Sequence, residues 1–155
     1  MNKTQSSAGP EHWRIAIAVA QFNPTITALL LKGTRQTLDQ AGVADERVEV
    51  FEVPGAWELP LACQQLAGCG RFDAVIALGA VVRGETAHFD FISAECAHGL
   101  QRVSLDSGVP VAFGVLTPEN GEQALERADP KRKNKGREVA QAALDMLVLK
   151  ARVAS

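Results

Sequence analysis

The segment RGETAHFD, residues 83–90, follows an apolar stretch and combines a glycine, a hydroxyl, acidic groups and a histidine. Gly84, Glu85 and Thr86 are predicted to form a short turn at the amino end of a helix. There, free backbone amides and a hydroxyl can bind an anion such as phosphate. His88 follows in the first helical turn, where an imidazole can exchange protons near neutral pH. An ordinary helix cap beside a surface histidine is the competing interpretation.

Two bulky aromatic residues, Phe22 and Trp57, stand at the ends of apolar stretches rather than within them. Such rings can stack on a flat heterocycle, and packing in the core is the alternative explanation. Glu58 lies beside Trp57 at a predicted helix start. Its carboxylate is suited either to accept hydrogen bonds from ligand hydroxyls or only to favour the helix dipole.

A metal site is a further chemistry to consider, because Asp90, Glu95 and His98 lie close together in the sequence. Glu95 and His98 are three residues apart and so share one helical face. A catalytic metal needs about three converging protein ligands, and His88 lies too far along the helix to join this pair. The sequence therefore disfavours a metal site.

The segment RADPKRKNKGR, residues 127–137, contains six basic residues in eleven. It is predicted to be a solvated loop between helices, and a nucleic-acid patch is the competing interpretation. No aromatic residue is interleaved for base stacking, and the whole chain has a net charge of only −2. Nucleic-acid binding is therefore disfavoured.

Four apolar, β-branched stretches must position these residues, and they are predicted to be strands. They cover residues 14–22, 48–54, 73–82 and 109–117. The first, third and fourth are almost continuously apolar, which is typical of strands buried on both faces. The second alternates with Glu49 and Glu52, which predicts a place nearer the edge of the sheet.

Helical segments lie between and after these strands. The first begins with Asn23 as a capping residue and Pro24 at the first helical position, and it ends at Gly42. The others are predicted at residues 56–67, with a tolerated proline in the first turn, and at 89–105, 122–128 and 136–153. Alternation of strand and helix implies right-handed crossovers and helices on both faces of a parallel sheet. We expect an α/β, three-layer αβα, flavodoxin-like domain with a four-stranded parallel sheet.

Ligands of such sheets bind beyond the carboxyl ends of the strands, which is where the residues described above lie. The turn after the first strand, AQFNP, has no glycine, and the chain has no GxxxxGK[ST] motif. Binding of dinucleotides or nucleoside triphosphates is therefore disfavoured, because close approach to their phosphates requires glycine.

The length of 155 residues predicts one domain, residues 14–155, preceded by a flexible amino-terminal arm of residues 1–13. Those first thirteen residues contain no apolar signal segment, and no apolar run approaches the roughly 20 residues of a membrane span. Three cysteines at unpatterned spacings indicate buried thiols rather than a disulfide framework. We expect a cytoplasmic protein that binds no membrane.

An ordered set of motifs resembles the 6,7-dimethyl-8-ribityllumazine synthase family from about residue 14 to residue 149. RGET alone is a weak signal, but the set in this order is highly specific. The motifs are FN at 22–23, VPGAWELP at 53–60, ALGAVVRGETAHFDFI at 77–92, VAFGVLT at 111–117, EQALERA at 122–128 and NKG at 134–136.

The resemblance implies condensation of 5-amino-6-(D-ribitylamino)uracil with 3,4-dihydroxy-2-butanone 4-phosphate, with release of phosphate and water. It implies no cofactor, because proton transfers and an anion site suffice. The family pattern places Phe22 or Trp57 against the pyrimidine ring, and it places Asn23, Ala56 and Glu58 near the ribityl chain. Backbone groups of Val81 and Val82 contact the heterocycle in this pattern. The phosphate lies against Glu85, Thr86 and Arg127, and His88 is the proton shuttle. Phe113 and Lys135 come from a neighbouring subunit in this pattern, so a homo-oligomer is expected.

Two departures from the family pattern concern pocket size and assembly. Trp57 stands where many members have phenylalanine, and DPKRK at 129–133 replaces a smaller stretch that usually contains glycine. The family forms homopentamers, which either stay separate or close into an icosahedral shell. The length of this loop favours the shell, whereas like charges on Lys131, Arg132 and Lys133 oppose closure. A non-catalytic flavin- or lumazine-binding member is the functional alternative, and retention of Thr86, His88 and Arg127 disfavours it.

Overall fold

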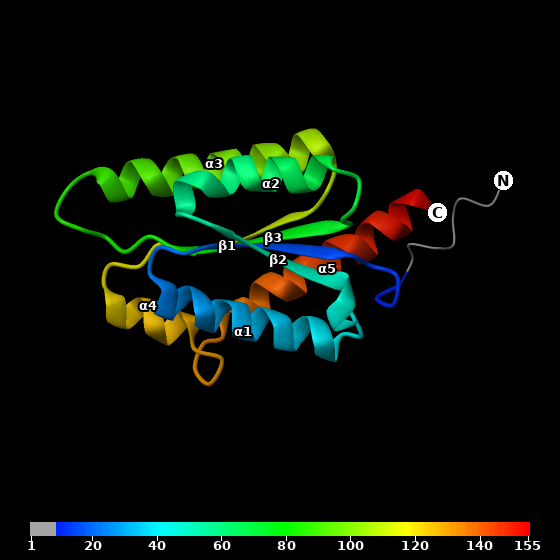
Figure 1. Cartoon of the computed structure of the whole chain (residues 1–155), viewed down its shortest axis with the longest axis horizontal. Coiled ribbons are helices and arrows are strands. Elements are labelled where there is room, and N and C mark those ends of the chain that lie inside the picture. The colour runs from blue at the N-terminus through cyan, green and yellow to red at the C-terminus, as the bar shows by residue number, and fades with distance from the viewer. Residues whose placement is uncertain (1–8) are drawn as a thin grey trace.

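A computed structural model describes residues 9–155 of the chain (Figure 1). One parallel sheet has the strand order β2-β1-β3-β4. Its strands are β1 (Ile15–Ala20), β2 (Val48–Val53), β3 (Ala74–Ala80) and β4 (Val111–Leu116). The α-helices of the described residues are α1 (Pro24–Gln40), α2 (Leu59–Gly68), α3 (His88–Ser107), α4 (Gly121–Ala128) and α5 (Lys135–Ala154). Short 3-10 helices are η1 (Asp45–Arg47) and η2 (Ala56–Glu58).

The helices form two layers, with α2 and α3 on one face of the sheet and α1, α4 and α5 on the other (Figure 1). Side chains of β1 alternate between these layers. Ile15, Ile17 and Val19 pack under α1, α4 and α5, whereas the alanines between them pack under α2 and α3. The small alanines leave room for the side chains of α2. The expected three-layer αβα fold with a four-stranded parallel sheet is confirmed.

The burial predicted from the sequence agrees better with the structure for one outer strand of the sheet than for the other. β2 is an edge strand with Glu49 and Glu52 exposed, as its alternating pattern predicted. β4 is the other edge strand, and it is buried on both faces as predicted except at Val111 and Phe113. Phe113, in the middle of β4, has 45% of its surface exposed. An apolar run shows that the residues of a strand are hydrophobic, but it does not show whether the strand lies in the centre or at the edge of the sheet.

The start of α1 also differs from the prediction. Asn23 occupies the N-cap position, but its side chain does not cap the helix. Its backbone is left-handed, with φ 63° and ψ 58°, and Nδ2 donates a hydrogen bond of 3.0 Å to the carbonyl of Ala80. Asn23 therefore joins the start of α1 to the end of β3. Pro60 does lie in the first turn of α2, as predicted, although residues 56–58 form a 3-10 turn.

The amino-terminal arm falls largely outside the described residues, because residues 1–8 are not among them. Trp13, at the end of the expected arm, is only 3% exposed and belongs to the core cluster that also contains Leu38 of α1 and Leu147 of α5. None of the helices within residues 9–155 is long and apolar enough to cross a membrane.

The three cysteines carry free thiols. Cys63 and Cys96 are buried, as predicted, and burial raises the pKa of the Cys63 thiol to about 12 and that of Cys96 to about 11. Both thiols are therefore protonated at neutral pH. The prediction of burial was wrong for Cys69, which follows the last turn of α2 and is exposed.

Candidate active site

The segments that follow the four strands meet at the carboxyl edge of the sheet and continue its pairing. The amides of Gln21 and Phe22 donate to the carbonyls of Val53 and Pro54 at 2.8 and 3.0 Å. On the other side of the sheet, the amides of Val81 and Arg83 donate to the carbonyls of Leu116 and Pro118 at 2.8 and 3.0 Å. These hydrogen bonds keep the loops that follow the strands in register, so that the loops lie side by side at the carboxyl edge of the sheet.

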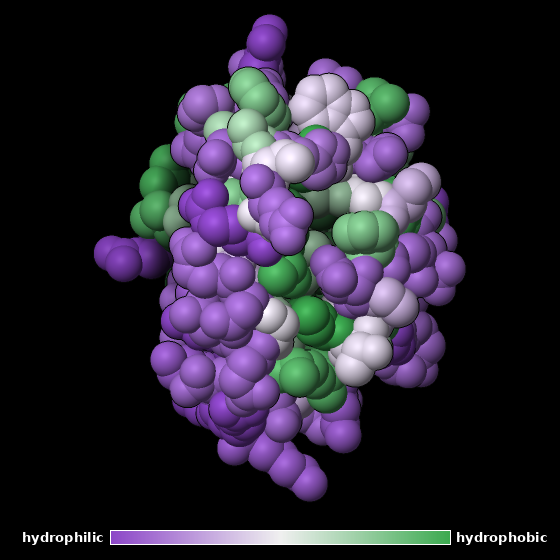
Figure 2. All heavy atoms as spheres, turned by 90° about the vertical axis from the view of Figure 1, so that its left-hand side faces the viewer, coloured by the Kyte–Doolittle hydropathy of each residue, from purple (hydrophilic) through white to green (hydrophobic). Residues whose placement is uncertain are grey.

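Eight of the predicted site residues line one cavity of about 680 Å³ at this edge. They are Phe22, Ala56, Trp57, Glu58, Val81, Val82, Thr86 and His88. Figure 2 shows the molecule from this side, where hydrophobic side chains gather in the middle of the face between hydrophilic borders. The cavity therefore joins an apolar floor to a few polar groups, which is the usual character of a small-molecule site.

The two aromatic rings of the cavity are strongly exposed. Phe22 has 73% and Trp57 has 58% of its surface accessible. Packing in the core was the alternative interpretation of these residues, and their exposure excludes it. Two large exposed rings beside one cavity are suited to bind the faces of a planar ligand.

The polar end of the cavity is the turn that precedes α3. The hydroxyl of Thr86 accepts a hydrogen bond of 3.3 Å from the amide of His88, the first residue of the helix. The side chains of Thr86 and His88 are both exposed beside the cavity. Glu85 is exposed in the same bend but does not line the cavity. This end therefore offers a hydroxyl, an imidazole and a helix N-terminus to a ligand.

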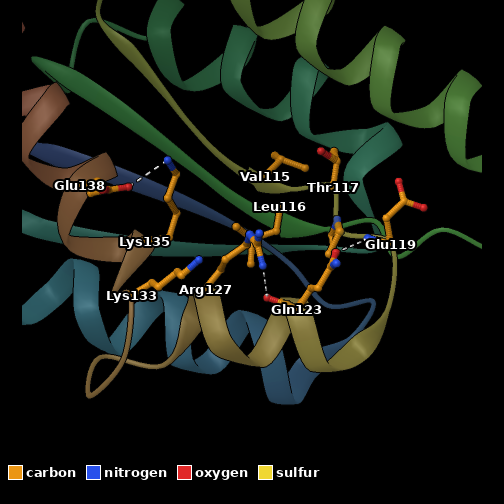
Figure 3. A pocket seen from close by; sticks show the side chains of 10 residues that line it. Val115, Leu116, Thr117, Glu119, Gln123, Arg127, Lys133, Lys135 and Glu138 are labelled. Carbon is orange, nitrogen blue, oxygen red and sulfur yellow. Dashed lines mark hydrogen bonds and ion pairs between the residues drawn. The ribbon is translucent and has the colours of Figure 1, made fainter.

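Other predicted residues lie around a second cavity of about 490 Å³ (Figure 3). Arg127 of α4 and Lys133 of the following loop point into the same space, and Lys135 of α5 lies beside them. A guanidinium nitrogen of Arg127 donates to the carbonyl of Gln123 at 3.1 Å, and the ammonium of Lys135 pairs with Glu138 at 2.9 Å. This second cavity is therefore cationic, with carboxylates at its border.

The structure of one chain does not bring all predicted site residues together. Arg127 and Lys135 line the second cavity, whereas Thr86 and His88 line the first. Phe113 lies on the exposed edge strand and lines neither of these two cavities. Sequence motifs alone could not show this separation, because it depends on where β4, α4 and α5 pack.

Sequence reasoning missed the contacts of Arg83, although this residue belongs to the RGET motif. Its guanidinium pairs with Glu119 at 2.8 Å and with Asp90 at 3.4 Å. The same guanidinium lies over the ring of Phe89, 4.3 Å from the ring centroid. The available signal was a basic residue directly between a strand end and the candidate anion turn.

Within residues 9–155, no group of three or more histidine, cysteine, aspartate or glutamate side chains is arranged to hold a metal ion. Glu95 and His98, the pair considered from the sequence, both lie on α3.

Together, the parallel αβα sheet and the cavity at its carboxyl edge define a flavodoxin-like domain with a site suited to a small, partly planar molecule. A sequence profile described as 6,7-dimethyl-8-ribityllumazine synthase matches residues 12–151. The chain is also 51% identical over 153 residues to a protein named 6,7-dimethyl-8-ribityllumazine synthase from Edwardsiella ictaluri (strain 93-146), and the match covers 97% of this chain and 98% of that protein. The chain belongs to the 6,7-dimethyl-8-ribityllumazine synthase family.

Proposed function

We propose that this protein is a transferase of riboflavin biosynthesis. It condenses 5-amino-6-(D-ribitylamino)uracil with 3,4-dihydroxy-2-butanone 4-phosphate to 6,7-dimethyl-8-ribityllumazine and releases phosphate and water. Membership of the family supports this reaction. Among the structural observations, the one that carries the proposal is the single cavity that joins the exposed rings of Phe22 and Trp57 to Thr86 and His88.

In this proposal, the pyrimidine ring lies against Phe22 or Trp57, and the ribityl chain lies near Asn23, Ala56 and Glu58. Because Nδ2 of Asn23 is already bonded to the carbonyl of Ala80, the group that Asn23 offers is its side-chain oxygen. The carboxylate of Glu58 accepts hydrogen bonds from ribityl hydroxyls.

Backbone groups of Val81 and Val82 complete the binding of the heterocycle. The amide of Val81 donates to the carbonyl of Leu116, so Val81 offers its own carbonyl instead. A carbonyl accepts hydrogen bonds from ring N–H groups, so this contact favours a pyrimidine with its donors toward the sheet.

The chemistry requires a site for phosphate and a group that moves protons. Imine formation, loss of phosphate, tautomerisation and ring closure each transfer protons, and none of them transfers electrons to an external acceptor. His88 accepts and donates these protons. Glu85 and Thr86 hold the phosphate through the turn before α3, and the planar guanidinium of Arg127 binds its oxygens. The proposal therefore includes no cofactor and no metal.

A neighbouring copy of the chain completes the site. Lys135 lines a cavity other than that of His88, and Phe113 is exposed on an edge strand, which supports their contribution across a subunit boundary. The same separation favours this origin for Arg127. Membership of the family supports an oligomer. We propose a homopentamer as the basic assembly and a shell of twelve such rings as its larger form.

The location of the enzyme is cytoplasmic in this proposal, because three free thiols in a small domain fit a reducing compartment. Its partners are small-molecule substrates and copies of itself, and it binds neither nucleic acid nor a membrane.

The decisive experiment mixes the purified protein with the two substrates and follows the absorbance and fluorescence of the lumazine, with and without a chelator. We expect product at the same rate in both samples. Activity that a chelator abolishes and one metal restores would contradict the absence of a metal. Tight binding of lumazine without any turnover would instead support a non-catalytic binding protein.

A further inference from the structure

Arg83 connects three segments at the carboxyl edge of the sheet. Its backbone amide donates to the carbonyl of Pro118 at 3.0 Å. Its side chain pairs with Glu119 at 2.8 Å and with Asp90 at 3.4 Å, and the guanidinium carbon lies 4.3 Å from the centroid of the Phe89 ring. Phe89 and Asp90 follow His88 directly in the first turn of α3.

We propose that Arg83 is a positioning residue for the reaction described above, on which this inference rests. Arg83 fixes the first turn of α3 against the loop between β4 and α4, and it thereby sets the place of the His88 imidazole in the cavity. Arg83 itself does not line that cavity. It therefore acts through the backbone and through its neighbours rather than on the substrate.

The geometry suits arginine because the planar guanidinium can use its edge and its face together. The edge pairs with two carboxylates from different segments, and the face lies over an aromatic ring. Phe89 is only 8% exposed, so the ring that Arg83 covers is itself fixed in the core. Lysine has a compact ammonium on a flexible stem and cannot reproduce both contacts.

Stability does not explain this cluster well. The side chain of Arg83 is 40% exposed, and those of Asp90 and Glu119 are each 60% exposed. Ion pairs that are open to solvent contribute little to the free energy of unfolding. The position of a proton-transfer group has a much larger effect on the reaction rate, because a displacement of about 1 Å can slow a reaction by as much as ~10²-fold.

The same contacts extend from Arg83 to the second cavity. The amide of Glu119 donates to the side-chain oxygen of Gln123 at 2.8 Å. The backbone carbonyl of Gln123 then accepts the hydrogen bond from Arg127 at 3.1 Å. Arg83 is thus linked to the anion-binding guanidinium as well as to the turn of His88.

Substitution of Arg83 by methionine tests the role in positioning. Because His88 is displaced while the contacts to the pyrimidine remain, we expect kcat to fall about 10-fold, within the ~10²-fold range for a misplaced group. KM for the pyrimidine, whose contacts lie outside the turn of residues 84–88, should stay within about 2-fold. Arg83→Lys should recover little of the lost turnover. Arg102→Met is the control, because Arg102 is an exposed arginine of α3, the helix that begins at His88, and it has one ion pair, to Asp106. It should leave kcat unchanged.

A double variant shows whether Arg83→Met lowers kcat through His88 or by an effect that does not involve His88. If Arg83 acts through the imidazole, Arg83→Met should slow a His88→Ala enzyme no further, because effects of residues that act as a unit are not additive. Additive losses, or a normal kcat in Arg83→Met, would overturn the proposal. So would a loss of thermal stability with kcat unchanged.

Hydrogen exchange tests the same contact without any turnover, so that it remains informative if the wild-type protein makes no lumazine. Amides of residues 84–92 should exchange faster in Arg83→Met than in the wild type, whereas those of residues 98–107 should not change. Equal exchange of residues 84–92 in both proteins would overturn the proposal. Faster exchange in a protein without any lumazine synthesis would refute the proposed reaction and leave Arg83 a purely structural residue.

Discussion

At the residue scale, His88 combines an exposed imidazole with a place at the polar end of the cavity. We predict that His88→Ala lowers kcat by about 10²-fold, at the low end of general acid–base effects, because imine chemistry also proceeds in water. KM for the butanone phosphate should change little. Steady-state kinetics measure both constants. His98→Ala is the control, since His98 is an exposed histidine of α3 outside the cavity. An unchanged kcat in His88→Ala would remove His88 from the mechanism.

Arg127 is the guanidinium that the proposal assigns to phosphate. We predict that Arg127→Ala raises KM for 3,4-dihydroxy-2-butanone 4-phosphate by about 10- to 150-fold, because a hydrogen bond to a charged group contributes roughly 1.5 to 3 kcal/mol. KM for the pyrimidine should change far less. Arg132→Ala serves as the control, since Arg132 pairs with Glu122 at 3.2 Å and does not line the cavity of Arg127. Equal weakening of both substrates would contradict the assignment.

At the scale of the elements, the contact between α1 and α5 depends on Gly136. A Cβ atom at this position would lie 2.4 Å from the carbonyl oxygen of Leu30 and 2.9 Å from the amide nitrogen of Thr34. These are backbone atoms of α1, so the two helices would have to separate. The hydroxyl of Thr34, which donates to the carbonyl of Leu30 at 2.8 Å, also lies 3.3 Å from the carbonyl oxygen of Gly136. This close contact holds the start of α5, and with it Lys135.

We predict that Gly136→Ala lowers the free energy of unfolding by about 1–3 kcal/mol, the usual cost of overpacking a tight interior. Thermal or denaturant unfolding of the variant measures this loss. Gly121→Ala is the matched control. Gly121 is the first residue of α4, and a Cβ there would meet no atom within 4 Å. A Gly136→Ala protein as stable as the wild type would show that α1 and α5 separate at little cost.

At the scale of the whole molecule, the basic loop is the feature that bears on assembly. The like charges of Lys131, Arg132 and Lys133 oppose the closure of a shell where copies meet. Two of these charges have acidic neighbours within the chain, because Arg132 pairs with Glu122 at 3.2 Å and Lys133 lies 3.8 Å from Glu126. Such partners offset part of the repulsion and so favour the proposed sixty-subunit shell.

We predict that light scattering detects at least a pentamer under all conditions and a sixty-subunit shell in part of a salt and phosphate series. Screening and bound anions should favour the shell, since both reduce repulsion among the loops. A monomer with full activity would refute the shared site. A pentamer that never enlarges under any ionic condition would refute the shell.

Much of the fold follows from local patterns in the sequence. The continuous apolar runs of β1 and β3 predict central strands, and both strands are fully buried. The helical periodicity after Pro24 predicts α1, which ends two residues before the expected Gly42. These elements are predictable because hydrophobic periodicity and the backbone limits of proline and glycine act over a few residues.

The sequence by itself determined the alternation of strands and helices, and it predicted the end of the sheet for a ligand site and the chemistry of RGETAHFD, because these depend on residue types and short spacings. Only the tertiary structure decided that Asn23 binds the end of β3, that Phe113 lies on an exposed edge and that Arg83 joins three segments. It also decided that Arg127 lies in a different cavity from His88. The physical reason is that each of these contacts joins segments that are distant along the chain, and their approach is set by the packing of whole helices on the sheet.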